Sequence, residues 1–339
     1  MTQSANPFET ANETAALREA LWRAQRELGK AKARNAELVE ATIRAAKDAT
    51  LAIGPVPPVP APKSDRRHAR AEVALWHLTD WQGGKETTSY NSAVMRERVE
   101  RFADRAQELT ELTRAHHPVR EAVILFGGDM VEGLFNFPTQ PFEVDASIFA
   151  QYVQASRLMV DVVRRALAIY AKVSVVSEWG NHGRIGSKRS AIPRNDNVDR
   201  MCYELARQLL AGEKRLAWDD CPNDIQRVEV GNYRALLIHG DEIGRNGFAS
   251  LNTIAQHANR WRSGAYPWQF RDLYVGHYHT HYETSLADGL GAIYGTGSTE
   301  SDNRYAMEQL ASSASPSQRL HFIDPEKGRS TAQYKVWVA

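Results

Sequence analysis

The segment Ala122-Val-Ile-Leu-Phe-Gly-Gly-Asp-Met-Val-Glu132 joins a short apolar run to a polar turn. A continuous apolar run of this length, closed by glycine, is typical of a strand that is buried on both faces. Upstream, residues 73–78 have the pattern of another strand, and residues 93–115 have that of a helix between the two. This strand, helix, strand order predicts an α/β protein.

The alternation continues on the other side of this segment. Residues 146–170 and 197–210 have helical patterns, and residues 173–177 between them form another apolar run. Beyond Asn223 we expect mostly short strands. They are residues 226–230, 235–238, 272–275, 292–295, 318–323 and 334–338. These strands predict a second sheet.

Polar residues of the kinds that bind metals follow nearly every expected strand, each group beside glycine. They are Asp80 and Gln82, Asp129 and Glu132, Asn181 and His182, His239 and Asp241, and His277 and His279. Folds of the α/β class build their sites where strands end. Two neighbouring divalent cations need oxygen and imidazole ligands from several strands, with one carboxylate that can bridge them. The pattern therefore predicts a two-metal site.

These blocks, in this order, resemble those of the calcineurin-like metallophosphoesterases. The family pattern is DxH, GDxxD, GNH followed by an acidic residue, a lone His, and GHxH. The counterparts here are Asp80-Trp-Gln82, Gly128-Asp-Met-Val-Glu132, Gly180-Asn-His182, His239 and Gly276-His-Tyr-His279. The resemblance covers residues 71–339. It implies a four-layer α/β/β/α sandwich of two mixed sheets flanked by helices.

The resemblance also implies a role for each matching residue. One metal would be held by Asp80, Gln82, Asp129 and His279, and the other by Asp129, Asn181, His239 and His277. Asp129 would bridge the two cations, and a hydroxide between them would attack phosphorus in line. His182 would act as general acid and protonate the leaving oxygen.

The sequence departs from the family pattern at three positions. Gln82 stands where His is usual, and its amide oxygen favours manganese, or else magnesium, over zinc. The alternative is that Gln82 does not bind and the first metal is held loosely. Glu132 replaces the second Asp of GDxxD and could still support the site from outside the ligand shell. Gly183 replaces the acidic residue that usually orients the histidine. Arg184 comes next, and its guanidinium could hold a phosphate oxygen in catalysis.

Two loops beside these blocks are candidates for substrate binding. Phe135 and Phe137 could stack on bases, and Arg184, Lys188 and Arg189 could contact a phosphate backbone. The motif order, without the residues typical of protein phosphatases, looks most like the DNA repair-nuclease branch and the phage-encoded metallophosphoesterases. We therefore expect a DNA phosphodiesterase.

Two other functions stay open. A hydrolase of a small nucleotide or a phosphomonoester fits the formal net charge of +1, because no overall basic field indicates nucleic acid. A non-catalytic scaffold with a degenerate metal site is the second alternative, suggested by Gln82 and Gly183. The retention of Asp129, Asn181 and His182 argues against it.

The N-terminal region is expected to form a separate element. In residues 1–53, apolar and small residues recur in steps of four and three from Leu17, which predicts a coiled coil and a homodimer. A helix that packs on its own catalytic domain is the alternative. Residues 54–70 form a Pro-rich and basic linker, and residues 71–339 the catalytic domain. Without a signal peptide or a membrane-spanning apolar run, we expect a cytoplasmic protein.

Overall fold

The computed structural model divides the chain into two compact units, Met1–Ile53 and Gly54–Ala339. The described residues are Arg26, Arg44 and Asp48, and 54–67, 69–134, 136, 140–185, 196–220, 223–243, 249–302 and 315–339. The expected coiled coil therefore lies outside the described residues, apart from three single positions with helical backbone. The architecture below is that of the second unit.

The first sheet of this unit is mixed, with the strand order β11-β10-β1-β2-β3-β4. The strands are β1 (Glu72–Leu78), β2 (Val119–Phe126), β3 (Lys172–Ser177), β4 (Leu216–Trp218), β10 (Ser317–Asp324) and β11 (Arg329–Trp337). Neighbours among β1 to β4 are parallel, whereas β10 is antiparallel to β1 and to β11. The carboxyl ends of the four parallel strands consequently point to one edge of the sheet.

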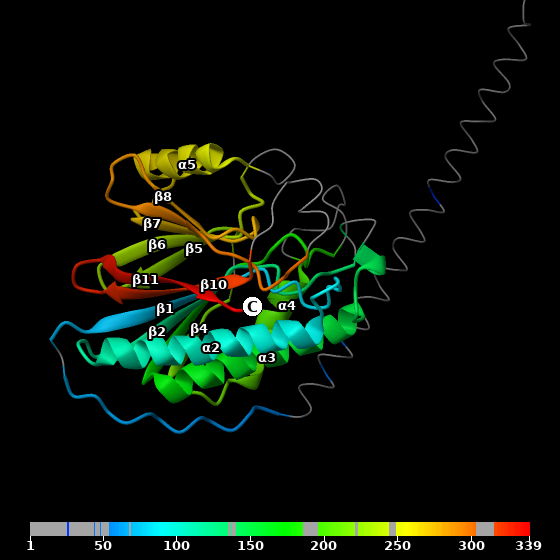
Figure 1. Ribbon diagram of the computed structural model, residues 1–339, viewed down its shortest axis with the longest axis horizontal. Helices are drawn as coiled ribbons and strands as arrows, with labels where there is room; N and C mark the ends of the chain where they lie inside the picture. The colour runs from blue at the N-terminus through cyan, green and yellow to red at the C-terminus, as the bar shows by residue number, and fades with distance from the viewer. Residues whose placement is uncertain are drawn as a thin grey trace, which may run out of the picture. The chain divides into compact units, whose positions relative to one another are not determined.

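Three helices cover the outer face of this sheet (Figure 1). They are α2 (Ser92–Arg114), α3 (Ile148–Ile169) and α4 (Val198–Leu209), with the short 3-10 helix η1 (Gln140–Phe142) before α3. Asn91 begins α2 by accepting hydrogen bonds from the first backbone amides of the helix. Trp76 of β1 packs edge-on against Phe102 and Tyr170, at 5.6 and 6.0 Å between ring centroids. These aromatic contacts fix the helices on the sheet.

The second sheet has the order β5-β6-β7-β9-β8 and is also mixed. Its strands are β5 (Gln226–Val230), β6 (Tyr233–Ile238), β7 (Asp272–Val275), β8 (Tyr282–Ser285) and β9 (Ala292–Gly295). Alternate residues such as Leu75 and Leu237 share one core between the two sheets. The opposite face packs on α5 (Leu251–Arg260), which the π-helical turn η3 (Trp261–Ala265) follows. The expected four layers, helices, sheet, sheet and helix, are confirmed (Figure 1).

The bounds of most expected helices and strands are confirmed within a few residues. The main difference is in how the strands pair into sheets. The sequence predicts a second sheet from all strands after Asn223, but β10 and β11 belong to the first sheet. Strand β10 pairs with β1 and is buried along its whole length, so it completes the first sheet. Helix α5 was not expected. Its apolar contacts to the second sheet come from few positions, mainly Ile254 and Ala258.

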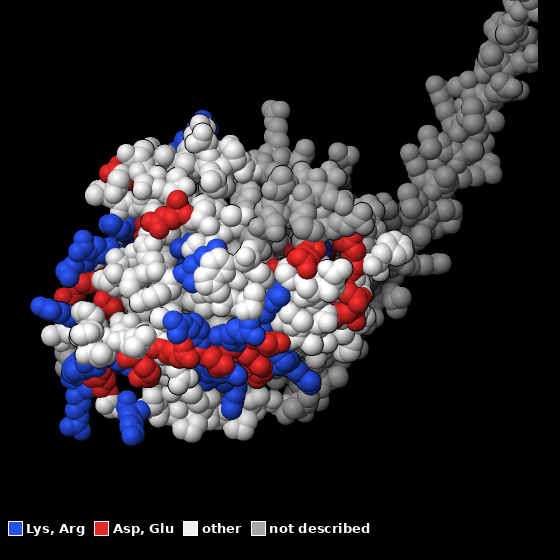
Figure 2. Space-filling model, in the orientation of Figure 1, with Lys and Arg blue, Asp and Glu red and all other residues white. Residues whose placement is uncertain are grey.

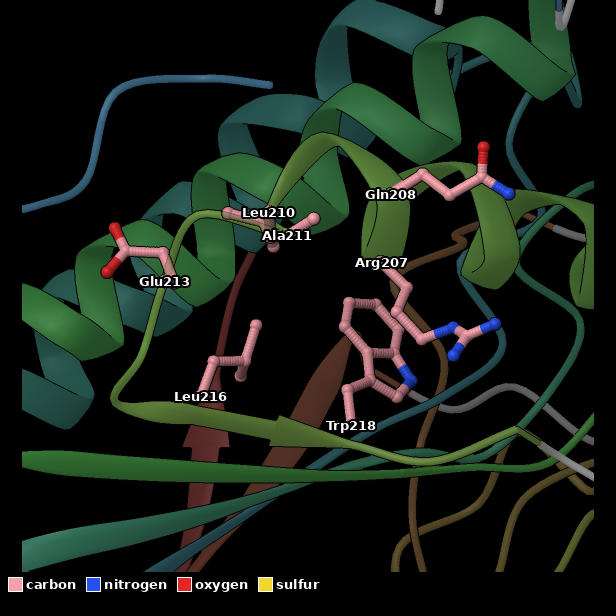
Figure 3. Close-up of a pocket in the computed structure, with 7 residues that line it drawn as sticks. All are labelled: Arg207, Gln208, Leu210, Ala211, Glu213, Leu216 and Trp218. Atoms are coloured by element: carbon pink, nitrogen blue, oxygen red, sulfur yellow. The ribbon is translucent and has the colours of Figure 1, made fainter. Parts of the chain in front are cut away.

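The Pro-rich residues that follow Gly54 run along the second unit as a segment without helix or strand (Figure 1). Val56 donates a backbone hydrogen bond to Leu209 (2.9 Å), and Arg215 Nη2 donates to the Val59 carbonyl (2.8 Å). Next to this segment is a cavity of about 310 Å³ between α4 and β4. Its lining residues, seen in Figure 3, are Arg207, Gln208, Leu210, Ala211, Glu213, Leu216 and Trp218. The cavity is at the carboxyl end of α4, a helix length away from the site described below.

The visible helical face carries both signs of charge. Along α2, Arg101 pairs with Glu97 at 2.6 Å and Arg105 pairs with Glu108 at 2.5 Å. Figure 2 shows blue and red side chains interleaved over this face. Such a mixed surface does not attract a polyanion. Across the described part of the chain, no helix combines the length and apolar character that a membrane span needs.

Candidate metal centre

The residues singled out at the strand ends meet where the two sheets face each other. Strands β1, β2 and β3 of the first sheet and β6 and β7 of the second are followed directly by the residues that were expected to bind metals. Asp80, Gln82, Asp129 and His239 are at most 1% exposed. The centre is therefore buried, and side chains from five strands reach it.

The first predicted ligand set is joined by short contacts. His279 Nε2 lies 3.2 Å from Asp80 Oδ1 and 3.2 Å from the amide nitrogen of Gln82. That amide nitrogen is also 3.4 Å from Asp129 Oδ2. Gln82 Oε1 is buried without a hydrogen-bond partner among the described residues, so turning the amide would present an oxygen to the same space. Gln82 can thus serve as the oxygen ligand that replaces the usual His.

The second predicted set centres on Asp129. His239 Nε2 lies 3.0 Å from Asp129 Oδ2, and the rings of His239 and His277 are 5.1 Å apart. One ligand atom from each of these three residues falls within 4.8 Å of the others. Asn181 Oδ1 is buried and makes no hydrogen bond within the described ranges. Asp129 therefore contacts both sets, as a bridging carboxylate would.

The backbone at these positions is unusual. Left-handed φ angles occur at Asp80 (54°), Gln82 (49°), Asp129 (52°), His277 (64°) and His279 (51°). Residues other than glycine avoid this region because the Cβ crowds the backbone, at a cost of about 1–3 kcal/mol each. Strain of this kind persists where the surrounding structure enforces it, commonly at functional sites. The strained conformations occur at five predicted ligands, which indicates that the backbone there is held in the conformation that directs these side chains into the site.

Glycines allow the ligand loops to approach one another. A Cβ at Gly180 would overlap the carboxylate and the backbone nitrogen of Asp129. A Cβ at Gly276 would overlap the Thr79 hydroxyl and lie 2.7 Å from Asp80 Oδ2. Both positions require glycine because no side chain fits between the loops. This explains why glycine accompanies the ligand residues in the sequence.

Asp199 at the start of α4 holds the second ligand set from behind, and the sequence analysis missed it. Its buried carboxylate accepts hydrogen bonds from the backbone amides of Asp129 (2.8 Å), Met130 (3.0 Å), Val131 (3.3 Å) and Gly180 (2.9 Å). The available signal was Asn197-Val-Asp199 at a helix start, since Asn197 caps α4. In sequence alone, that pattern indicates only a helix terminus.

Replacing Asp199 by alanine should remove the acceptor of four buried amides. Each unsatisfied donor costs about 1–3 kcal/mol, so for four donors we expect a loss of at least about 4 kcal/mol in unfolding free energy and a 10- to 100-fold weaker Mn²⁺ affinity. Denaturant titration and calorimetry measure the two effects. Asp104→Ala, which removes an exposed carboxylate on α2, is the matched control. A folded Asp199→Ala protein with unchanged Mn²⁺ affinity would contradict this role.

His182, the expected general acid, is oriented by Glu132. Its Nδ1 lies 3.2 Å from Glu132 Oε2 and 3.1 Å from the Glu132 carbonyl oxygen. Its Nε2 is 4.0 Å from Asp129 Oδ2. Burial opposes protonation, but the Glu132 and Asp129 carboxylates outweigh it and raise the pKa of His182 to about 9. Glu132 therefore supplies the orienting carboxylate that Gly183 lacks.

Arg184 lies beside the same centre. Its guanidinium forms an ion pair with Asp241, two residues after His239. Arg184 Nε is buried and has no acceptor among the described residues. A guanidinium beside the metal ligands whose Nε–H has no acceptor among the described residues could bind a phosphate oxygen.

The two loops expected to contact substrate are only partly described. Asn136 Nδ2 donates to the carbonyl oxygens of Asn181 (2.7 Å) and His182 (2.9 Å), and Gln140 Nε2 donates to that of Glu132 (2.7 Å). The Asn136 amide thus joins the first loop to the His182 loop, and Gln140 Nε2 also lies 3.3 Å from His182 Nδ1. Phe135, Phe137, Lys188 and Arg189 lie outside the described residues.

The donor set fits divalent cations. It consists of carboxylate, amide and imidazole groups without thiolate, which suits manganese, magnesium or zinc. Burial opposes protonation of His279, but hydrogen bonds to Asp80 and Glu300 raise its pKa to about 10. Burial lowers the pKa of His277 to about 4, so that its imidazole is neutral as a ligand must be. A cation bound beside Asp80 would replace the proton on His279.

No protein-family model and no curated protein matches the sequence. Among solved structures, the vacuolar protein sorting 29 protein of Cryptosporidium parvum is 14% identical, over 79% of this chain and 99% of that one, with a TM-score of 0.34. A predicted phosphoesterase from Streptococcus pneumoniae is 11% identical over 79% and 99%, with a TM-score of 0.30. The sulfate thiohydrolase SoxB of Thermus thermophilus is 9% identical over 81% and 58%, with a TM-score of 0.33. Likenesses of this size leave the function to be inferred from the residues of the metal centre.

Proposed function

We propose that this chain is a metal-dependent phosphoesterase that holds two divalent cations. The observation that carries the proposal is the position of Asp129, whose Oδ2 contacts His239 at 3.0 Å on one side and the Gln82 amide at 3.4 Å on the other. A shared carboxylate between two N/O donor sets is the arrangement that a cation pair requires. Such cations would stabilise the negative charge that develops on phosphoryl oxygens during hydrolysis.

The residues of the chain supply the remaining functions. His182 would donate a proton from Nε2 to the leaving oxygen, because Glu132 engages its Nδ1. Arg184 would orient the phosphate through its unsatisfied Nε–H while Asp241 holds the rest of the guanidinium. Both groups lie beside the ligands that would hold the cations. The proposal therefore assigns proton transfer and substrate orientation to separate side chains.

DNA is the substrate that we propose, with manganese as the preferred cation and magnesium as the alternative. Both loops with aromatic and basic residues start at the centre, one directly after Glu132 and the other directly after His182. A strand bound there could stack on aromatic rings and pair its phosphates with cationic side chains. The oxygen ligand at Gln82 supports a hard cation. Self-association through residues 1–53 stays a prediction, which light scattering of the full chain tests.

The function is tested by supplying and removing metal. Wild-type protein is incubated with labelled single-stranded or duplex DNA, p-nitrophenyl phosphate or its bis ester, in manganese, magnesium or EDTA. We expect DNA cleavage with manganese, none with EDTA, and recovery when manganese is restored. Turnover of the small esters alone would favour a nucleotide phosphoesterase or a phosphomonoesterase. No metal-dependent turnover of any substrate would contradict the proposal and favour the scaffold.

A further inference from the structure

A buried lysine lies behind the centre, on the loop that also carries Asp80 and Gln82. Lys85 is 7% exposed, and its backbone amide donates to the Gln82 carbonyl oxygen at 2.9 Å. Its ammonium nitrogen is 3.5 Å from Glu132 Oε1 and 3.6 Å from Glu300 Oε1. Glu143, at 3.6 Å, is a third partner but is largely exposed. Lys85 is thus the cation between two buried carboxylates.

Each of these carboxylates holds a different histidine of the centre. Glu132 Oε2 lies 3.2 Å from His182 Nδ1, and Glu300 Oε2 lies 3.1 Å from His279 Nδ1. In both cases one carboxylate oxygen faces Lys85 and the other faces the imidazole. The contacts therefore form one continuous chain from His182 through Lys85 to His279. It links the expected general acid to an expected ligand of the first metal.

The positive charge of Lys85 allows this series of side-chain contacts to be buried. Two carboxylates taken out of water repel each other and lose hydration, and a buried charge without a partner costs several kcal/mol. Burial opposes the charge on Lys85, but Glu132 and Glu300 outweigh it and raise the Lys85 pKa. The ammonium lies between the two carboxylates and can hold each of them beside its histidine. Carboxylates that orient metal-binding histidines typically contribute 10- to 100-fold to metal affinity or activity.

We propose that Lys85 is a positioning residue that couples the proton donor to the first metal position, acting on His182 through Glu132 and on His279 through Glu300. Its role in turnover rests on the proposed hydrolysis, whereas its role in metal binding rests only on the cation-binding part of the proposed function. The proposal predicts a specific pattern of effects on metal binding and turnover. Loss of Lys85 should weaken both metal binding and turnover, and loss of either carboxylate should weaken only one.

The test compares four variants by calorimetric Mn²⁺ titration without substrate and by turnover of labelled DNA, whose leaving oxygen needs a proton, at saturating Mn²⁺. Lys85→Met, which keeps the length of the side chain, should bind Mn²⁺ 10- to 100-fold more weakly and also lower kcat about 10-fold. Glu300→Gln should weaken Mn²⁺ binding by a similar factor with kcat within about 2-fold. Glu132→Gln should lower kcat about 10-fold with Mn²⁺ affinity within about 2-fold. Lys172→Met, an exposed lysine on β3, should change neither.

The outcomes separate this proposal from the function on which it partly rests. If the wild type hydrolyses nothing, the proposed function fails, but the Mn²⁺ titrations of Lys85→Met and Glu300→Gln still decide the role of Lys85. Wild-type Mn²⁺ affinity in folded Lys85→Met would overturn the coupling. So would equal losses of affinity and turnover in all three buried variants, since that indicates general disruption of the loop. If circular dichroism shows Lys85→Met unfolded, Lys85→Gln replaces it, and wild-type affinity there overturns the proposal equally.

Discussion

Replacing Asp129 by alanine is expected to abolish metal-dependent hydrolysis and to weaken Mn²⁺ binding at both positions. Asp129 contacts His239 and the Gln82 amide, and its Oδ1 accepts a 2.7 Å hydrogen bond from the backbone nitrogen of His182. One substitution thus removes a ligand from each set and a support of the proton donor. Residues that only contact metal ligands typically contribute 10- to 100-fold to metal affinity. For Asp129, which is itself a predicted ligand, we therefore expect an affinity loss of about 100-fold or more. Calorimetry and ester hydrolysis measure it.

Asp161→Ala is the matched control for this variant. Asp161 is an exposed carboxylate on α3 that pairs with Arg96 at 3.3 Å, so its loss removes the same charge far from the centre. We expect wild-type metal affinity and turnover from it. If Asp129→Ala kept one Mn²⁺ position at wild-type affinity, Asp129 would not bridge two cations. The two-metal proposal would then reduce to a single metal position.

The sequence predicts the strands that build this centre better than the way they pair. Residues 272–275 and 292–295 are apolar runs between polar turns, and β7 and β9 have those bounds. Local periodicity carries this information because each run must be buried on both faces. The pairing of β10 with β1 joins residues about 250 positions apart, such as Val73 and Ile323. Only tertiary packing decides such a contact, so the sheet that β10 joins could not be read locally.

The same division applies to the site. Ligand-type residues beside glycine mark the ends of strands, and the structure brings six of them close together: Asp80, Gln82, Asp129, His239, His277 and His279. The supporting residues escape prediction because their contacts are long-range and their local patterns are ordinary. The local sequence around Asp199 indicates only the start of a helix, and Lys85 and Glu300 have the pattern of charged loop residues. The two carboxylates that face Lys85, those of Glu132 and Glu300, lie 47 and 215 positions away from it in the sequence.

His182→Ala is expected to lower kcat by about 100- to 10,000-fold while Mn²⁺ affinity stays within a few-fold of the wild type. General acid catalysis contributes a factor of this size, because the leaving oxygen otherwise departs without a proton. His182 Nε2 is 4.0 Å from Asp129 Oδ2, outside direct contact, so its removal leaves the ligand sets in place. Labelled DNA, whose alkoxide leaving group needs the proton, is the suitable substrate for comparing kcat at saturating Mn²⁺.

A leaving group of lower pKa gives the sharper form of this experiment. If His182 protonates the leaving oxygen, the kcat deficit of His182→Ala should be large for DNA, whose alkoxide leaves poorly, and small for the bis ester, whose nitrophenolate leaves without help. His116→Ala, an exposed histidine after α2, controls for loss of an imidazole elsewhere and should match the wild type. An equal deficit on both substrates would assign His182 to binding or metal support. A Mn²⁺ affinity that fell in parallel with kcat would make it part of the ligand shell instead.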